Sequence, residues 1–288
     1  MKRVLAVIGG SGLYAFEAIE GAERISVATP WGPPSDAIVR GRINGVDTLF
    51  LARHGQGHRL PPSAVNYRAN IDALKRLGAT DVVAVSACGS LKEELAPGAF
   101  ALVDQFIDRT TGREKSFFGT GFVAHVSMAD PVCPALRAAL AEACRESGVA
   151  CAPRATYVCI DGPQFSSRAE SHLYRSFGAD VIGMTNMPEA KLAREAELPY
   201  ASVAMVTDYD CWRENEKPVE VAAVLDTMRA NTARARLVIA ALAARLGPER
   251  APSPIDTNLD FAVITAPDAR DPALVAKLDA VAGRFLKR

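Results

Sequence analysis

The sequence predicts an α/β fold: a single domain whose mixed, mostly parallel central sheet is flanked by helices. Strand-like apolar runs alternate with helical patterns along most of the 288 residues, which is typical of a sheet covered on both faces. A hydrophobic content of 49% is ample for the core that such a sheet needs. Several apolar runs end in glycine, hydroxyl or charged residues, and sheets of this kind bind ligands at the carboxyl ends of their strands.

The strands are predicted from short runs rich in valine, isoleucine, leucine and alanine. In chain order they are Val4–Ile8, Thr48–Ala52, Asp81–Ser86, Phe100–Asp108, Ala155–Ile160, Asp180–Gly183 and Tyr200–Val206. The clearest helix follows the second strand, at Ser63–Leu77, with Ser63 as the expected N-cap and Gly78 just beyond its end. The other helices are predicted at Pro134–Ser147, Ser166–Phe177, Pro188–Glu197 and Val219–Leu246.

We expect the chain to divide into a domain at residues 1–246 and a C-terminal tail at residues 247–288. Prolines between Gly247 and Pro254 end the long helix before the tail. A short amphipathic helix is expected within Asp268–Arg288. Its apolar side chains predict that the tail packs on the domain or on a neighbouring subunit.

Composition argues against several kinds of partner and site. Thirty-three basic residues balance thirty-three acidic ones without a basic cluster, which argues against nucleic acid as a partner. The apolar runs Val4–Ile8 and Leu237–Ala244 are too short for a signal-peptide core or a membrane span, so we expect a cytoplasmic protein. The six cysteines and four histidines show no zinc-binding spacing, so neither a metal site nor a disulfide framework is predicted.

Two aspartates, Asp208 and Asp210, follow the last predicted strand closely. Side chains two residues apart on a strand point to the same side, so both carboxylates are expected to project together. Two acceptors at this separation suit a flat heterocycle with two N–H groups on one edge, such as adenine with a proton on N7. The alternative is that Asp208 caps a turn while Asp210 is solvated.

Three other strand ends carry groups that suit an anion. The first strand leads into a glycine-rich turn with Ser11, the second ends at Arg53 and His54, and the third ends at Ser86. Because neighbouring parallel strands end at one edge, these groups predict a shared oxyanion site. The alternatives are a structural turn, a surface arginine with a capping histidine, or a dinucleotide site, although the acidic residue that a dinucleotide needs is missing.

The fourth strand end and one turn complete the predicted site. Thr185 stands before a helix start, where it is available to an anion, and Met184 offers apolar contact to a sugar. The turn Asp161–Ser166 places Phe165 where it could stack on a base. Core packing is the alternative for both Met184 and Phe165.

Several long runs together make the chain similar to the purine nucleoside phosphorylase family between about Val4 and Leu246. They are Ile8–Leu13, Leu51–Gly55, Pro62–Ser63 with Val65–Tyr67, Ala87–Leu91, Asp104–Thr111, Phe165–Ser171 and Thr207–Trp212. The chain departs from the family at Ser11 and Ser86, where threonine is common, at Gly183, where some members have a polar residue, and in the tail. The resemblance implies a nucleoside phosphorylase-like fold.

The resemblance also implies an activity: the reversible cleavage of S-methyl-5′-thioadenosine by phosphate to adenine and 5-methylthioribose 1-phosphate, in methionine and purine salvage. Phosphate would be a co-substrate, with no cofactor and no metal. The family pattern implies a homotrimer in which His125 enters the site of an adjacent subunit. The tail residue that contacts the neighbour's site is not assigned.

The roles that the resemblance implies fall into three groups. Phosphate would be bound by Ser11, Arg53, His54, Ser86 and Thr185, with Ala87 contributing from its backbone. Met184 would contact the ribose, Phe165 the base, Asp208 the N7 edge as the catalytic residue and Asp210 the amino group. Val221 and Val224 would border the methylthio pocket with His58, and Ser166 and Val221 are the expected specificity positions.

Three rival functions differ in what they need. A 6-oxopurine nucleoside phosphorylase is opposed by the second carboxylate, Asp210. A nicotinamide-dependent oxidoreductase would use the glycines at Gly10 and Gly12. A non-catalytic purine-binding regulator would leave the cluster of Arg53 and its neighbours without a purpose.

Overall fold

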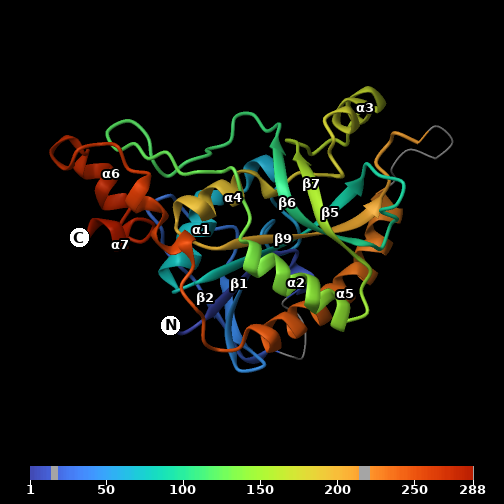
Figure 1. The fold of residues 1–288 in the computed structure, drawn as a ribbon, viewed down its shortest axis with the longest axis horizontal. Helices are drawn as coiled ribbons and strands as arrows, with labels where there is room; N and C mark the ends of the chain where they lie inside the picture. The colour runs from blue at the N-terminus through green and yellow to red at the C-terminus, as the bar shows by residue number, and fades with distance from the viewer. Residues whose placement is uncertain (14–18, 214–220, 288) are drawn as a thin grey trace.

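A computed structural model describes residues 1–13, 19–213 and 221–287, with the side chains of Ser11 and residues 221–224 outside the description. In this part of the chain nine strands form one sheet, with helices on both faces (Figure 1). The strands are β1 (Val4–Gly9), β2 (Glu20–Ile25), β3 (Ile38–Ile43), β4 (Val46–Ala52), β5 (Asp81–Ser90), β6 (Phe100–Asp108), β7 (Cys151–Cys159), β8 (Val181–Gly183) and β9 (Tyr200–Asp208). The helices are α1 (Tyr67–Arg76), α2 (Pro134–Glu146), α3 (Arg168–Ser176), α4 (Asn186–Glu195), α5 (Val221–Leu246), α6 (Pro272–Lys277) and α7 (Gly283–Leu286).

The sheet mixes parallel and antiparallel pairs, as predicted. Its order is β2-β3-β4-β1-β5-β8-β7-β6-β9, and β5 also pairs with β9, which closes the last five strands into a ring. β1 runs parallel to β4 and β5, and β5 runs parallel to β9. These four strands therefore bring their carboxyl ends to one edge of the sheet, which confirms the predicted fold class and positions the candidate site.

Two strands that the sequence did not predict, β2 and β3, form an antiparallel edge next to β4. Most residues of β2 are exposed, so the strand lacks the apolar run by which the other strands were predicted. β3 carries two arginines and a glycine among its apolar residues, which hides its pattern in the same way.

The core has two layers because alternate residues of the strands face opposite sides of the sheet. In β1, Ala6 and Ile8 pack with α1, α4 and the C-terminal tail, whereas Leu5 and Val7 pack with α2 and α5. Figure 1 shows α2 and α5 together over one face of the sheet. Both faces of the central strands are therefore buried, and this packed sheet holds the polar groups at the strand ends in place.

The helix predicted at Ser63–Leu77 begins later than expected. Asn66 is the N-cap of α1, and its side chain accepts a hydrogen bond from the backbone N–H of Ala69 (3.1 Å). Ser63 lies instead in a separate 3₁₀ turn at Pro62–Ala64. Its hydroxyl bonds groups near the candidate site, so it is not available to cap the helix.

The C-terminal tail packs on the body of the protein beside α1 and α4 (Figure 1). Leu278, Val281 and Ala282 are buried in the same core cluster as the strands. Arg284 also pairs with the buried Glu197 (Nη2 to Oε1, 2.6 Å). The division into a domain at 1–246 and a tail at 247–288 stays a prediction, because the tail shares this core.

Candidate active site

Arg53, directly after β4, ties the carboxyl ends of β1 and β4 and the middle of β5 to helix α4. Its guanidinium bonds the carboxylate of Glu189 through Nε (2.8 Å) and Nη2 (3.0 Å). Nη1 donates to the carbonyl of Val85 (3.1 Å) and Nη2 to that of Ile8 (3.3 Å). Burial lowers the pKa of Arg53, but the Glu189 charge and its hydrogen bond outweigh burial and raise the pKa above its ordinary value.

The burial of Arg53 decides between two of the alternatives for this residue. The side chain is only 2% exposed, so the interpretation as a surface arginine is wrong. These four hydrogen bonds use four of the five N–H groups that a guanidinium carries. The remaining N–H group is on Nη1, and it leaves Arg53 able to contact one oxygen of an anion.

His54 offers a ligand a hydrogen-bond acceptor and not a donor. Its Nδ1 lies 2.8 Å from the carbonyl oxygen of Leu60, and a carbonyl can only accept, so Nδ1 carries the proton. Burial, together with the charges of Arg53 and His58, lowers the pKa of His54 to about 4 although the hydrogen bond to Leu60 opposes this, so the ring is neutral at pH 7. Its Nε2 is then an acceptor suited to a phosphate oxygen that still bears a hydrogen. His58 stacks on this ring with the centroids 4.2 Å apart.

Ser86 and Thr185 meet at the start of α4. The Ser86 hydroxyl donates to Oδ1 of Asn186 (3.0 Å), and the Asn186 amide donates to the hydroxyl of Ser202. Thr185 is buried at the N-cap position of α4, but its side chain makes no capping hydrogen bond. Its hydroxyl is therefore available to a ligand. The residues after it do not form a regular helical turn, because Met187 has non-helical backbone angles, its N–H donates to the sulfur of Cys159, and Pro188 has no N–H. Ala87 follows Ser86 within β5.

Three residues predicted for the site have side chains outside the described part of the chain. Ser11 lies in the 3₁₀ turn at Ser11–Leu13 that follows β1, and Val221 and Val224 open α5. Their positions in the chain are compatible with the predicted roles, which stay predictions.

Asp208 and Asp210 lie together, although not for the reason that the strand spacing gave. β9 ends at Asp208, and Asp210 follows in a turn with a φ of 53°. A Cβ atom added at Gly89 would lie 3.0 Å from Oδ1 of Asp208 and 3.3 Å from Cβ of Asp210, so both residues pack against this glycine. The backbone N–H of Asp210 donates to Asp208 (2.8 Å), as does the hydroxyl of Thr207 (2.7 Å).

Both carboxyl groups hold a proton more readily than free aspartate. Burial raises the pKa of Asp208, although the hydrogen bonds from Thr207 and Asp210 oppose it. Burial also raises the pKa of Asp210, where the charge of Asp208 adds to the effect and the Ser171 hydroxyl opposes it. A carboxyl group with a raised pKa can pass a proton to a leaving base.

Met184 and Phe165 come from two neighbouring loops. Gly162 has a φ of 61°, and a Cβ atom added there would lie 2.3 Å from the sulfur of Met184, so the methionine packs on bare backbone. Phe165, three residues further on, is 47% exposed, which excludes the ordinary buried phenylalanine that was its alternative. An exposed ring at the edge of a site is free to lie against a base.

Ser166 joins the Phe165 loop to the carboxylates. Its carbonyl accepts a hydrogen bond from the thiol of Cys211 (3.2 Å), the residue after Asp210. Its hydroxyl is buried and finds no partner among the described residues. Such a group fits a contact with a ligand, because a buried hydroxyl is costly when it is left unpaired.

Arg113 and Glu189 are central to the site and were missed by the sequence analysis. Arg113 is buried and donates to the backbone carbonyls of Met184, Met187, Ile160 and Asp161. Glu189 is the partner of Arg53, 136 residues away in sequence. Local sequence patterns carry no sign of such distant partners, and both residues are charged groups that are expected at the surface.

His125 lies away from these groups, on a segment that pairs with the tail. Its backbone N–H donates to the carbonyl of Ala262 (2.8 Å), and Ala124 bridges to Val263. The side chain is exposed. In the described part of the chain, none of its contacts joins it to another predicted site residue.

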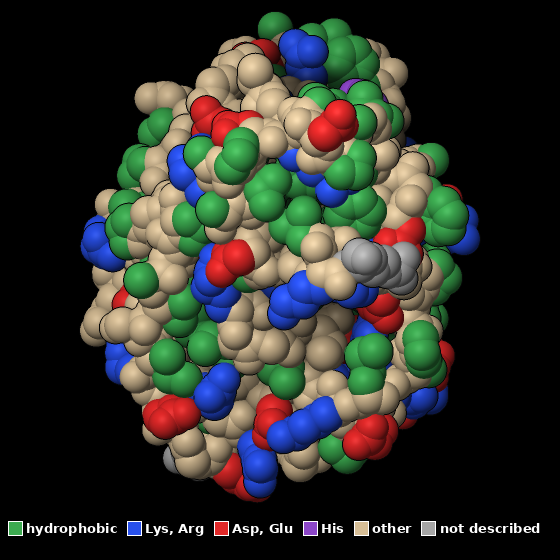
Figure 2. Space-filling model, turned by 90° about the vertical axis from the view of Figure 1, so that its left-hand side faces the viewer, with side chains coloured by type: hydrophobic (Ala, Val, Ile, Leu, Met, Phe, Trp, Pro, Cys, Tyr) green, Lys and Arg blue, Asp and Glu red, His purple; other side chains and the backbone are tan. Residues whose placement is uncertain are grey.

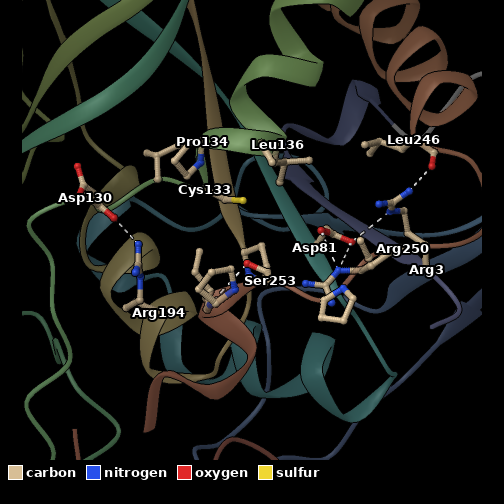
Figure 3. Close-up of a pocket in the computed structure, with 17 residues that line it drawn as sticks. Arg3, Asp81, Asp130, Cys133, Pro134, Leu136, Arg194, Leu246, Arg250 and Ser253 are labelled. Carbon is tan, nitrogen blue, oxygen red and sulfur yellow. Dashed lines mark hydrogen bonds and ion pairs between the residues drawn. The ribbon is translucent and has the colours of Figure 1, made fainter. Parts of the chain in front are cut away.

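A cavity of about 530 Å³ lies at the end of the sheet where β5 begins, opposite the carboxyl ends of the strands. None of the predicted site residues lines it. It contains Asp81, the first residue of β5, to which Arg3 (3.4 Å) and Arg250 (3.3 Å) are paired, as Figure 3 shows. The described residues hold no group of three or more His, Cys, Asp or Glu side chains placed to bind a metal. Within the same residues, none of the helices has the length and apolar character needed to cross a membrane.

The chain is similar to a known protein family and to proteins of known function. A family model described as the phosphorylase superfamily matches residues 4–244. The S-methyl-5′-thioadenosine phosphorylase of Cereibacter sphaeroides is 59% identical over 289 residues, which cover 100% of each protein.

Solved structures show the same relationship. A methylthioadenosine phosphorylase from an Antarctic soil metagenomic library has a TM-score of 0.93 and 49% identity, covering 97% of this chain and 99% of that one. A mutant of the adenosine/methylthioadenosine phosphorylase of Schistosoma mansoni in complex with methylthioadenosine has a TM-score of 0.80 and 39% identity, covering 86% and 93%.

Proposed function

The chain belongs to the phosphorylase superfamily, and from this premise we propose how its residues share the work of one reaction. The enzyme catalyses the reversible phosphorolysis of S-methyl-5′-thioadenosine to adenine and 5-methylthioribose 1-phosphate, a pentosyl transfer in methionine and purine salvage. One observation carries the assignment of residues: the half-buried Asp208 and the buried Asp210 lie at the same edge of the sheet as the cluster around Arg53.

The cluster at the ends of β1 and β4 and within β5 binds phosphate. Arg53 contributes its remaining N–H group, and Ser86 and Thr185 contribute hydroxyls. Nε2 of His54 accepts a hydrogen bond from a phosphate oxygen that bears a hydrogen. Ser11 and the backbone of Ala87 complete the set. Phosphate held below C1′ supplies the nucleophile and stabilises the cationic character of the sugar in the transition state.

Asp208 acts on the base as the catalytic residue. As the N-glycosidic bond breaks, adenine gathers negative charge, and a proton from Asp208 to N7 neutralises it. The raised pKa of Asp208 supports this role, because burial keeps a proton available. Proton transfer of this kind contributes roughly 10² to 10⁴ in rate. Asp210 accepts a hydrogen bond from the 6-amino group and so favours adenine over 6-oxopurines.

The remaining residues set the fit of the nucleoside. Met184 contacts the ribose and Phe165 lies against the base. Ser166 contributes its unpaired buried hydroxyl to the recognition of the base. His58, Val221 and Val224 border the methylthio group, with Val221 as the second specificity position. An apolar pocket of this kind favours thiomethyl over hydroxyl by about 10- to 200-fold.

We propose that three copies form a homotrimer in which His125 completes the site of a neighbour. His125 is exposed, and next to its segment Phe261 is 92% and Ile264 66% exposed. Figure 2 shows apolar side chains among charged ones on the face that carries the C-terminal tail. Light scattering tests the assembly: a mass of three times 30.6 kDa supports it, and a mass of two or six times that value opposes it.

We also propose that phosphate is a co-substrate, that no cofactor is needed, and that the enzyme is cytoplasmic. All six cysteines are free thiols, which fits a reducing compartment.

The decisive experiment incubates the purified protein with S-methyl-5′-thioadenosine, with and without inorganic phosphate, and follows free adenine. Release that depends on phosphate is the expected result. Release without phosphate would instead mean a hydrolase, and the roles given to Arg53, Ser86 and Thr185 would be wrong. Asp208→Asn is the matched control, because it removes the proton donor while leaving the phosphate cluster in place.

A further inference from the structure

We infer that Arg113 is a positioning residue that holds the nucleoside half of the site, an inference that rests on the proposed function. The side chain is buried, and its guanidinium spans two loops that are far apart in sequence. Nη1 donates to the carbonyls of Met184 (2.8 Å) and Met187 (2.7 Å). Nη2 donates to the carbonyls of Asp161 (2.9 Å) and Ile160 (3.3 Å).

Three side chains hold Arg113 in this orientation. Its Nε lies 3.3 Å from Oδ1 of Asp161, which keeps its charge paired. The Ser63 hydroxyl is within reach of both Nε (3.3 Å) and Nη2 (3.1 Å), and the guanidinium lies 5.6 Å from the centroid of the Tyr67 ring. A planar guanidinium that is held by several partners can keep two backbone segments at a fixed separation. The ammonium group of a flexible lysine side chain cannot do this.

The two loops that Arg113 joins are those that meet the nucleoside. Met184 has its own carbonyl bound, so the backbone from which its side chain reaches the ribose is fixed. Asp161 is followed by Gly162, on which the Met184 side chain packs, and then by Phe165. Loss of Arg113 would free both loops at once, so Met184 and Phe165 would no longer be held against one substrate.

The phosphate half of the site has separate anchors. Glu189 holds Arg53, and Asn186 bonds Ser86 and Ser202 from the first turn of α4. Arg113 also bonds the carbonyls of Met184 and Met187, which flank Thr185 and Asn186, but the bonds of Asn186 and Glu189 hold this segment without it. A change at Arg113 therefore weakens nucleoside binding more than phosphate binding.

Steady-state kinetics of Arg113→Gln, with each substrate varied in turn, tests the inference. We expect the KM for S-methyl-5′-thioadenosine to rise at least ~10-fold, since small misplacements of a substrate cost up to about 10² in rate, while the KM for phosphate changes less than ~3-fold. An equal rise in both KM values would overturn the inference. If Arg113→Gln does not fold, Arg113→Lys keeps the charge without the fork, and an unchanged nucleoside KM in that variant would also overturn it.

Arg250→Gln is the matched control, because Arg250 is another buried arginine with carboxylate partners, at the opposite edge of the sheet. It should lower the melting temperature but leave both KM values unchanged; a nucleoside KM raised as much as in Arg113→Gln would overturn the inference. Calorimetric titration with adenine separates this inference from the proposed function, because it needs no turnover. A loss of adenine affinity in Arg113→Gln alone supports the inference even if the wild type releases no adenine, and equal affinity in all three proteins opposes it.

Discussion

The guanidinium of Arg53 and the carboxylate of Glu189 form a two-point ion pair, at 2.8 and 3.0 Å, with side chains that are 2% and 1% exposed. The Tyr200 hydroxyl donates to the same carboxylate (3.0 Å). The positive charge that we propose faces phosphate is thus already paired in the free enzyme. A buried pair is costly to break because the partner is left charged and unsatisfied.

Glu189→Gln should make the enzyme less stable, and its stability should depend more strongly on bound phosphate. The substitution leaves Arg53 charged but unpaired, which costs about 3–5 kcal/mol of unfolding free energy in buried sites. Phosphate then supplies the missing negative charge, so it should raise the melting temperature of the variant more than that of the wild type. Thermal melts across a phosphate titration measure both effects.

Glu197→Gln is the control for this prediction. Glu197 is also buried and paired with an arginine, Arg284, but beyond the far end of α4. It should lose stability without any added response to phosphate. A Glu189→Gln protein that phosphate stabilises no more than the wild type would mean that Arg53 does not face the anion.

Asp210→Asn should weaken the preference for adenine. Asparagine tolerates the positive φ of this position, and its amide offers a donor to a 6-oxo group where the carboxylate offers only acceptors. The ratio of kcat/KM for methylthioadenosine to that for methylthioinosine should fall by at least ~10-fold, since mispaired polar groups carry strong discrimination. Asp208→Asn should instead slow both substrates. An unchanged ratio in Asp210→Asn would remove this residue from base selection.

The sequence predicts much of this site because buried parallel strands have apolar runs that end at identifiable residues. Thr185 and Asp208 were predicted in this way, whereas Ser86, which was predicted at a strand end, lies within β5, because that strand continues to Ser90. Asp210 was paired with Asp208 from strand spacing, although a turn beyond the strand brings it there. The predicted proximity of the two carboxyl groups was right, but the reason given for it was wrong.

Long-range partners mark the limit of sequence reasoning here. Arg113 and Met184 are 71 residues apart, and Arg53 and Glu189 are 136 apart. Each is an ordinary charged or apolar residue within its own segment, so only the folded chain reveals the pairing. The same limit explains the helix start at Asn66, because the Ser63 hydroxyl that was expected to cap α1 is taken by Arg113.

Glu195 should make stability depend on pH near neutrality. It is buried at the end of α4 and accepts hydrogen bonds from the Ser116 hydroxyl (2.6 Å) and the backbone N–H of Phe117 (2.7 Å). Burial outweighs these bonds and raises its pKa from 4.5 to about 7. The folded state therefore binds this proton more tightly than the unfolded state, so stability falls as the pH rises from 4.5 through 7 and the loss is complete above it.

Glu195→Gln should remove this part of the pH dependence, because glutamine resembles the protonated acid. In the wild type the group contributes a slope of up to about 1.4 kcal/mol per pH unit within the window. Denaturant unfolding of both proteins at pH 5.5, 6.5, 7.5 and 8.5 isolates its contribution from that of the histidines. Parallel stability curves for the two proteins would show that Glu195 stays ionised throughout.

Gly183 and Tyr157 should prove to be energetically coupled. A Cβ atom added at Gly183 would lie 1.9 Å from the Tyr157 hydroxyl oxygen and 2.6 Å from the ring carbon that bears it, and Tyr157 is fully buried. Gly183→Ala should therefore cost about 1–3 kcal/mol of unfolding free energy, as overpacked cores do. Because Gly183 directly precedes Met184 and Thr185, the same displacement should also lower activity.

A double-mutant cycle tests whether the contact with Tyr157 causes the loss of stability in Gly183→Ala. Tyr157→Phe should give little relief, since the ring carbon remains, whereas the slimmer Tyr157→Met removes the obstacle at the cost of a small cavity. Gly183→Ala combined with Tyr157→Met should then be more stable than the sum of the two single changes by roughly 0.5–3 kcal/mol, the range found for residues in direct contact. Gly119→Ala, where an added Cβ meets nothing within 4 Å, should change stability little. Additive single effects would mean that the strand moves aside freely, and Gly183 would then have no steric reason to be glycine.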